Sequence, residues 1–103
     1  MPTYPSALIA LADPTRRGIY EAIVRKPRSV CVLASEFPVS RPAVSQHLRA
    51  LSDAGLVQMQ KEGARNVYTA RRNGLSDLRA YLDGLWDDVL TAFADEVERM
   101  SKP

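Results

Sequence analysis

Two helical segments separated by only three residues constrain this chain more than any other feature. The first covers residues 33–37, and the second covers residues 41–54 with Ser40 as its N-cap. Pro42 is compatible with the second helix because the first turn of a helix has free N–H groups. The link at residues 38–40 has the length found between the two helices of a helix-turn-helix unit.

Two stretches with β-like alternation follow this unit. They cover residues 56–61 and 66–71 and are joined by residues 62–65, which include Gly63. A glycine in a short link between alternating stretches is typical of a β-hairpin. A hairpin directly after a helix-turn-helix unit predicts a winged helix, with the wing at residues 57–71.

Four further segments complete the predicted order. They are helices at residues 5–12, 14–24 and 76–99 and a short extended piece at residues 29–32. Asp13 and Pro14 predict a helix start between the first two, and Gly55 supplies a left-handed helix end. The expected fold is mainly α with a small β-hairpin wing. At this length, residues 1–103 are expected to form a single domain.

The helix at residues 41–54 has a polar face that is suited to the major groove of DNA. At 100° per residue, Val44, Leu48 and Leu51 face the core, with His47 at the edge of that arc. The outward face carries a set of small, amide and guanidinium side chains, namely Pro42, Ser45, Gln46 and Arg49. Gln and Arg read adenine and guanine edges, and Ser bonds base or phosphate. An ordinary solvated helix face is the alternative for this pattern taken alone.

Charge is segregated along the chain. Residues 14–72 contain eleven Lys and Arg and four acidic residues, whereas residues 73–103 contain three basic and seven acidic residues. The net charges are therefore +7 and −4. A basic block indicates a surface for a polyanion, and together with the turn and the wing it favours DNA binding over a merely solvated helix.

The motifs LADPTRRGIYEAI and VSRPAVSQHLRALSDAGLV, followed by a hairpin ending in RNVYTA, resemble the ArsR-type winged-helix repressors of bacteria. The resemblance covers about residues 5–72. It implies a homodimeric, DNA-binding transcriptional regulator, usually a repressor that an effector releases from a double-stranded operator. The positions that match the family's DNA contacts are Ser40, Arg41, Ser45, Gln46 and Arg49, with Lys61 and Arg65 at the wing.

The hairpin tip also has a physical basis for DNA contact. Lys61 and Arg65 flank Gly63, so the tip can approach a narrow minor groove or its phosphates without a bulky side chain. We expect the contact from Arg65 rather than from Lys61, because arginine is the better minor-groove probe. Ordinary solubilising tip residues are the alternative.

The helix at the end of the chain carries a wide apolar stripe over residues 75–100. About 25 helical residues extend roughly 37 Å, longer than a small domain can cover, so a second copy is the expected cover. The helix at residues 5–12 is expected to pack alongside, which makes both terminal helices dimerisation helices. The predicted interface residues are Leu8, Leu11, Leu78, Leu82, Leu85, Trp86, Val89, Leu90 and Phe93. Folding of the stripe back on its own domain is the alternative.

The sequence predicts no bound metal and no cofactor. Many family members bind metals through a Cys-x-Cys pair, but here Cys31 is the only cysteine and His47 the only histidine. Zinc needs about four ligands. Between Val30 and Val32, Cys31 is expected to be a small buried side chain, and His47 is expected to bond backbone or phosphate through one ring nitrogen.

Three functions remain to be compared. The leading one is an operator-binding homodimer, and the second is a winged-helix module that uses its terminal apolar helix to bind another protein. A small enzyme or metal-storage protein is the third, and no catalytic constellation supports it. No apolar run approaches the roughly 20 residues of a membrane span, and no secretory signal is apparent. We therefore expect a cytoplasmic protein with no membrane partner.

Overall fold

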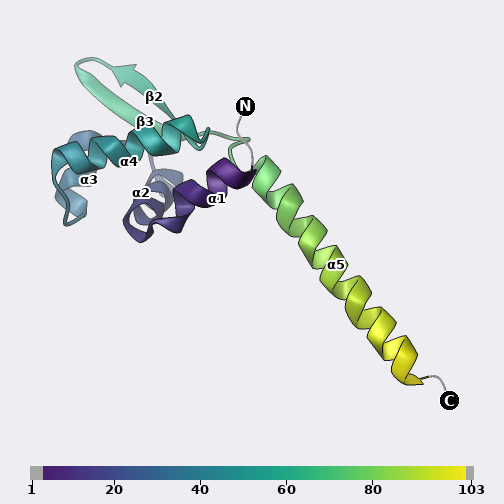
Figure 1. The fold of residues 1–103 in the computed structure, drawn as a ribbon. Coiled ribbons are helices and arrows are strands. Elements are labelled where there is room, and N and C mark those ends of the chain that lie inside the picture. The colour runs from purple at the N-terminus through teal and green to yellow at the C-terminus, as the bar shows by residue number, and fades with distance from the viewer. Residues whose placement is uncertain (1–3, 102–103) are drawn as a thin grey trace.

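The computed structural model describes residues 4–101, which form five helices and a small sheet. Figure 1 shows their arrangement. The ends of the predicted domain, residues 1–3 and 102–103, lie outside the described residues. The elements in chain order are α1 (Tyr4–Ala12), α2 (Pro14–Arg25), β1 (Arg28–Ser29), α3 (Val30–Glu36), α4 (Arg41–Asp53), β2 (Val57–Glu62), β3 (Arg65–Ala70) and α5 (Ser76–Ser101). The predicted winged-helix order is confirmed.

Short polar side chains cap the first turns of α2, α3 and α4, which belong to the compact part of the molecule before α5 (the body). Asp13 Oδ2 accepts the backbone N–H of Arg16 at 2.8 Å, and Ser40 Oγ accepts that of Ala43 at 3.3 Å. Ser29 caps α3 in the same way by accepting the N–H of Val32. The predicted extended piece at residues 29–32 is therefore wrong beyond its first residue, because the Ser29 cap starts a helix at Val30.

The hairpin has a tighter turn than predicted and belongs to a three-stranded antiparallel sheet in the order β1-β3-β2. Its register runs from Val57 opposite Ala70 to Glu62 opposite Arg65. The strands thus continue into the predicted four-residue link and leave a two-residue turn. Gly63 has φ +63°, the left-handed conformation that the first position of a tight hairpin turn favours.

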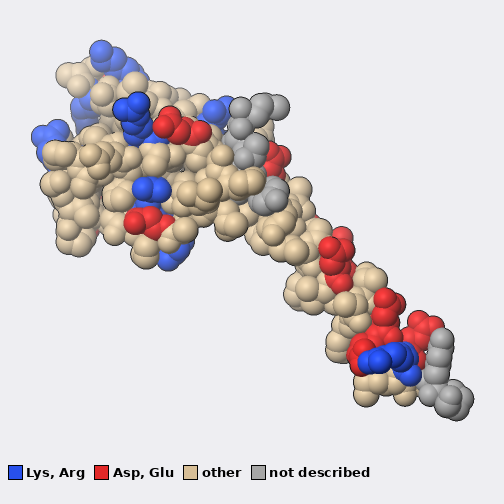
Figure 2. Space-filling view, in the orientation of Figure 1, with Lys and Arg blue, Asp and Glu red and all other residues tan. Residues whose placement is uncertain are grey.

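Helix α5 leaves the body and extends into solvent as a straight arm (Figures 1 and 2). It starts beside α1, where Leu78 is half-buried against the core. Beyond Tyr81 every residue of the helix is exposed. The described chain measures 72 × 26 × 20 Å, so the stripe beyond Tyr81 does not fold back on its own domain.

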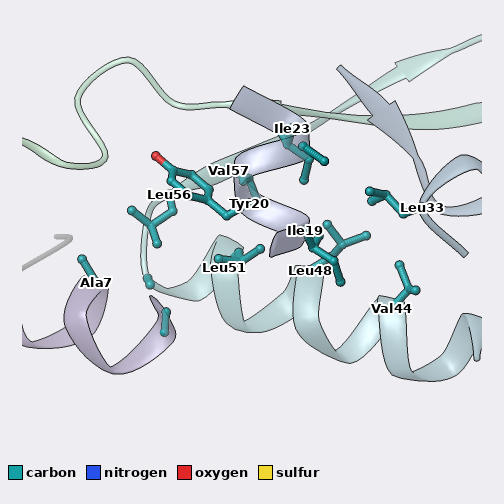
Figure 3. Packing of buried hydrophobic residues seen from close by; sticks show 13 residues of the cluster. Ala7, Ile19, Tyr20, Ile23, Leu33, Val44, Leu48, Leu51, Leu56 and Val57 are labelled. Atoms are coloured by element: carbon teal, nitrogen blue, oxygen red, sulfur yellow. The ribbon is translucent and has the colours of Figure 1, made fainter. Parts of the chain in front are cut away.

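The core holds α4 in place by its apolar face. Val44, Leu48 and Leu51 are 0% exposed, and Figure 3 shows them on the side of α4 that faces α2, with Leu48 beside Ile19. This confirms the predicted inward face of the helix. Tyr20, Leu33, Leu56 and Val57 complete the large side chains of the cluster. Because the inward face is fixed in this way, the opposite face of α4 is held toward solvent.

Candidate nucleic-acid interface

The predicted contact face of α4 is open to solvent. Every predicted residue on or before this helix is exposed, and these are Ser40, Arg41, Pro42, Ser45, Gln46 and Arg49. Their separation from the buried Leu48 follows from the 100° step of the helix. A short helix with an open amide and guanidinium face has the dimensions and donors that the major groove accepts.

The two predicted wing residues are both exposed, but they have different surroundings. The guanidinium of Arg65 donates from Nη2 to Ser29 Oγ at 3.4 Å. It also lines a groove of about 490 Å³ between the first turns of α3 and α4 and the end of the hairpin. Lys61 is exposed and lies outside that lining. The structure therefore places Arg65, and not Lys61, in one groove lining with Arg41 and Ser45 of α4.

Cys31 lines the same groove, and its side chain is exposed. The expectation of a buried cysteine is wrong. The cap at Ser29 places Cys31 in the first turn of α3, and in this turn it is Leu33 that is 0% exposed and faces the core. The capping serine is the sequence signal that could have placed Cys31 correctly, because it fixes where the helix begins.

His47 is half-buried and tied to α2. Its Nδ1 accepts a hydrogen bond from Arg16 Nε at 3.3 Å, so its partner is a side chain rather than backbone. A hydrogen bond from the backbone N–H of Arg16 lowers the pKa of the Asp13 carboxyl, and this effect outweighs the desolvation that raises it. His47 thus links α4 to the first turn of α2.

No three His, Cys, Asp or Glu side chains within residues 4–101 are grouped so that they could hold a metal ion. In the same range, no helix is long and apolar enough to cross a membrane. The charged residues follow the segregation seen in the sequence. On the face shown in Figure 2, Lys and Arg are spread over the winged-helix part of the molecule with a few acidic residues among them, whereas Asp and Glu predominate along α5.

A helix α4 anchored in the core by its apolar face, a basic wing and a four-residue link between α3 and α4 define a winged helix-turn-helix protein of the DNA-binding class. Residues 11–60 match a family described as a helix-turn-helix domain. The chain is 46% identical over 101 residues to the HTH-type transcriptional regulator Rv2034 of Mycobacterium tuberculosis. That alignment covers 95% of this chain and 94% of the relative.

Solved structures similar to this chain are also transcriptional regulators of the helix-turn-helix class. An ArsR-like transcriptional regulator from Rhodococcus sp. RHA1 has a TM-score of 0.77 and 32% identity, over 96% of this chain and 92% of that one. The homodimeric winged helix-turn-helix DNA-binding domain of Mb0332 from Mycobacterium bovis, described as a possible ArsR-family regulator, has a TM-score of 0.65 and 26% identity. It covers 82% of this chain and 78% of that one.

The chain belongs to the ArsR-type family of winged helix-turn-helix transcriptional regulators. The resemblance drawn from the sequence motifs is thereby confirmed. Further relatives that are 29% to 35% identical are named as repressors.

Proposed function

We propose that this protein is a homodimeric transcriptional repressor that binds an inverted-repeat operator through its recognition helix and wing. The observation that carries the proposal is the open polar face of α4, where Ser45, Gln46 and Arg49 are all exposed opposite a fully buried apolar face. At these positions Arg supplies paired donors for a guanine edge, and Gln supplies a donor and an acceptor for an adenine edge. The repressor names of several relatives support the direction of regulation.

The proposed dimer contact is the apolar stripe of α5. Trp86 is 63% exposed and Phe93 is 68% exposed. Burying a large apolar side chain contributes about 1.5–3 kcal/mol, so an exposed stripe on a helix of 26 residues favours a partner. The homodimeric domain of Mb0332 supports a second copy of this chain as that partner.

The structure refines which residues we propose for the interface. Along α5, the predicted residues Leu82, Leu85, Trp86, Val89, Leu90 and Phe93 are exposed, and so are Val97 and Met100. On α1, Leu8 and Ile9 are exposed, whereas Leu11 already packs on the body's own core. Leu78 is half-buried in the same way. We therefore propose Ile9 in addition to the predicted residues, with Leu11 and Leu78 at the margin.

The unit proposed for residues 1–103 is one winged-helix domain with residues 75–100 as its dimerisation helix. Its place of action is the cytoplasm, where a bacterial operator lies. Its partners are duplex DNA and a second copy, and an effector of unspecified chemistry completes the regulatory cycle that the family implies. The proposal assigns no catalytic step to the protein.

A protein-binding winged helix is the competing function, and it uses the same apolar arm for a different occupant. It does not require exposed Gln46 and Arg49 beside a basic wing. The class of named relatives also favours DNA regulation over this alternative.

The deciding experiment is a gel-shift with the DNA immediately upstream of the protein's own gene. We expect a dimer to bind an imperfect inverted repeat whose half-sites are about 34 Å apart, or a multiple of that distance. The affinity is expected to fall steeply with salt as phosphate counterions are released. Equal binding to unrelated duplexes at every salt concentration would contradict an operator function.

A further inference from the structure

A pocket of about 330 Å³ lies where α1, the first turn of α2 and the C-terminal half of α4 meet (the α1–α4 pocket). Its lining includes one cationic side chain, Arg16 of α2, and one anionic side chain, Asp53 of α4. Ala10 and Ala54 form part of the wall, and their small side chains leave space there. None of the lining residues is a predicted DNA contact. The volume is at the lower end of the range of small-molecule sites, which suits a small metabolite.

The two charged side chains of this pocket are not neutralised by ion pairs. Within residues 4–101, neither Arg16 nor Asp53 is part of one. The carboxylate of Asp13 accepts the backbone N–H of Arg16 and not its guanidinium. The guanidinium donates from Nε to His47, and it carries five N–H donors in all. The N–H groups of its Nη atoms are therefore available to an anionic group of a ligand.

Each of the two charges also lies at the helix end that favours the opposite charge. Arg16 is in the first turn of α2, and Asp53 is the last residue of α4. The N-terminus of a helix favours anions, and its C-terminus favours cations. An anionic group beside Arg16 is therefore attracted by both the guanidinium and the helix end. A cationic group beside Asp53 is attracted by both the carboxylate and the end of α4.

We infer that the α1–α4 pocket binds a small zwitterion of the amino-acid class, with its carboxylate on Arg16 and its ammonium on Asp53. Charge complementarity favours this ligand, because a simple anion leaves Asp53 unpaired and a simple cation leaves Arg16 unpaired. Ile9, which is 71% exposed, and Ala50 line the same pocket. An apolar side chain of the ligand is expected to lie against them, since burial of apolar surface adds to the affinity.

The α1–α4 pocket is connected to the helix that we propose for DNA binding. Asp53 belongs to α4, and Arg16 bonds His47 of the same helix. A carboxylate on Arg16 competes with this bond, which links α4 to α2. The ligand class thus becomes a candidate for the effector of the regulatory cycle. This regulatory role rests on the proposed function, whereas binding of the zwitterion does not.

The first experiment is an NMR titration of the full chain with L-leucine. His47 is the only histidine of the chain, so its imidazole signals report on the bond to Arg16. We expect saturable shifts of these signals and of the backbone amide signals of Ala10 and Ala54. Isocaproate lacks the ammonium group, and isoamylamine lacks the carboxylate. Each is expected to bind at least about tenfold more weakly, because it loses a hydrogen bond between charged groups.

Three results of the titration would overturn the inference. At about 10 mM L-leucine, a Kd of about 1 mM fills about nine-tenths of the sites, so the absence of any shift under these conditions is the first. Isocaproate or isoamylamine binding as tightly as L-leucine is the second. Binding only in the variant Trp86→Glu with Leu90→Glu is the third, because the second copy would then cover the pocket in the dimer.

The second experiment repeats the titration with Arg16→Gln and with Asp53→Asn. Each variant is expected to bind L-leucine at least about tenfold more weakly. The matched controls are Arg17→Gln and Asp95→Asn, which remove exposed charges outside the pocket lining, and both should keep the wild-type affinity. Wild-type affinity in Arg16→Gln and Asp53→Asn would refute the site.

Thermal unfolding of the variants tests whether they fold. Asp53 is exposed, so Asp53→Asn is expected to unfold at the wild-type temperature. This variant decides the case if the loss of the bond to His47 unfolds Arg16→Gln.

A gel-shift with and without saturating L-leucine tests the regulatory role. We expect L-leucine to lower the operator affinity of wild type by about fivefold or more and to leave that of Asp53→Asn unchanged. A protein that binds its operator but no L-leucine would refute the inference alone. A protein that binds L-leucine but no duplex would refute the operator function alone. Unchanged operator affinity with L-leucine bound would refute the effector role.

Discussion

Helices α4 and α5 are both amphipathic, but their apolar faces differ in exposure to solvent. The apolar face of α4 is fully buried, with Leu48 at 0% exposure, whereas α5 has no buried residue and exposes Trp86 at 63%. This difference in burial comes from the elements that pack against each helix. Helix α4 packs against α1, α2, α3 and β2, whereas the main neighbour of α5 is α1, which lies beside its first turns. The comparison teaches that α4 completes a core within the chain, while the exposed stripe of α5 fits our proposal of a core formed between two chains.

The largest expected effect comes from charging the stripe of α5. The variant Trp86→Glu with Leu90→Glu should dissociate the dimer and abolish specific operator binding, because each buried side chain lost removes about 1.5–3 kcal/mol in each copy. Sedimentation and a gel-shift measure the two effects. The control Thr91→Glu charges the same helix outside its apolar stripe and should leave the dimer intact. A monomer that binds the full operator at native affinity would refute the connection between α5 and DNA recognition.

Truncating the buried face of α4 should instead destabilise the body. Leu48→Ala is expected to lower the free energy of unfolding by about 2–5 kcal/mol, the cost of lost transfer energy and a residual cavity. Urea unfolding in the background of the charged α5 variant isolates this effect from dimerisation. In that background Leu85→Ala, on the exposed stripe, should change stability by less than about 0.5 kcal/mol. Equal losses of unfolding free energy for Leu48→Ala and Leu85→Ala would contradict the difference in burial between α4 and α5.

Changes on the outward face of α4 should affect DNA binding and not folding. Gln46→Ala and Arg49→Ala are each expected to weaken specific operator binding by about 1–3 kcal/mol. The thermal unfolding of both variants should match wild type, because both side chains are exposed. Unchanged operator affinity in both variants would exclude this helix from the major groove.

A smaller effect is expected from a change of pH, and it concerns the folding stability of the body alone. The pKa of Asp13 is lowered mainly by the backbone N–H of Arg16, so the folded state favours the carboxylate. The resulting stability is present above the ordinary aspartate pKa of about 3.9. It is lost as the pH falls through the lowered value. Unfolding curves between pH 5 and pH 2 should show this loss in wild type and a weaker loss in Asp13→Asn.

The smallest expected effect is that of added metal. Zinc, cadmium or arsenite should leave operator affinity unchanged, and the purified protein should contain no stoichiometric zinc. The physical reason is the ligand count, since one cysteine and one histidine fall short of the four ligands that zinc needs. Metal analysis and a gel-shift with each ion measure this. Tight stoichiometric metal would mean that Cys31 belongs to a site completed by other side chains or by a second copy.

Local rules were enough to predict much of this molecule from its sequence. The caps at Asp13 and Ser40 and the turn glycine at position 63 mark element ends through hydrogen bonds and φ values that involve only near neighbours. The 100° step then determines which face of α4 carries Leu48 and which carries Arg49. These features depend on residues within one or two turns, so the sequence by itself determined them.

Tertiary structure decided the contacts between elements. Arg65 meets Ser29 across 36 positions, and Arg16 meets His47 across 31, and no periodicity specifies such pairs. The same holds for the groove that exposes Cys31 and for the direction in which α5 leaves the body. An amphipathic pattern states which face of a helix is apolar, but what covers that face depends on how distant elements pack.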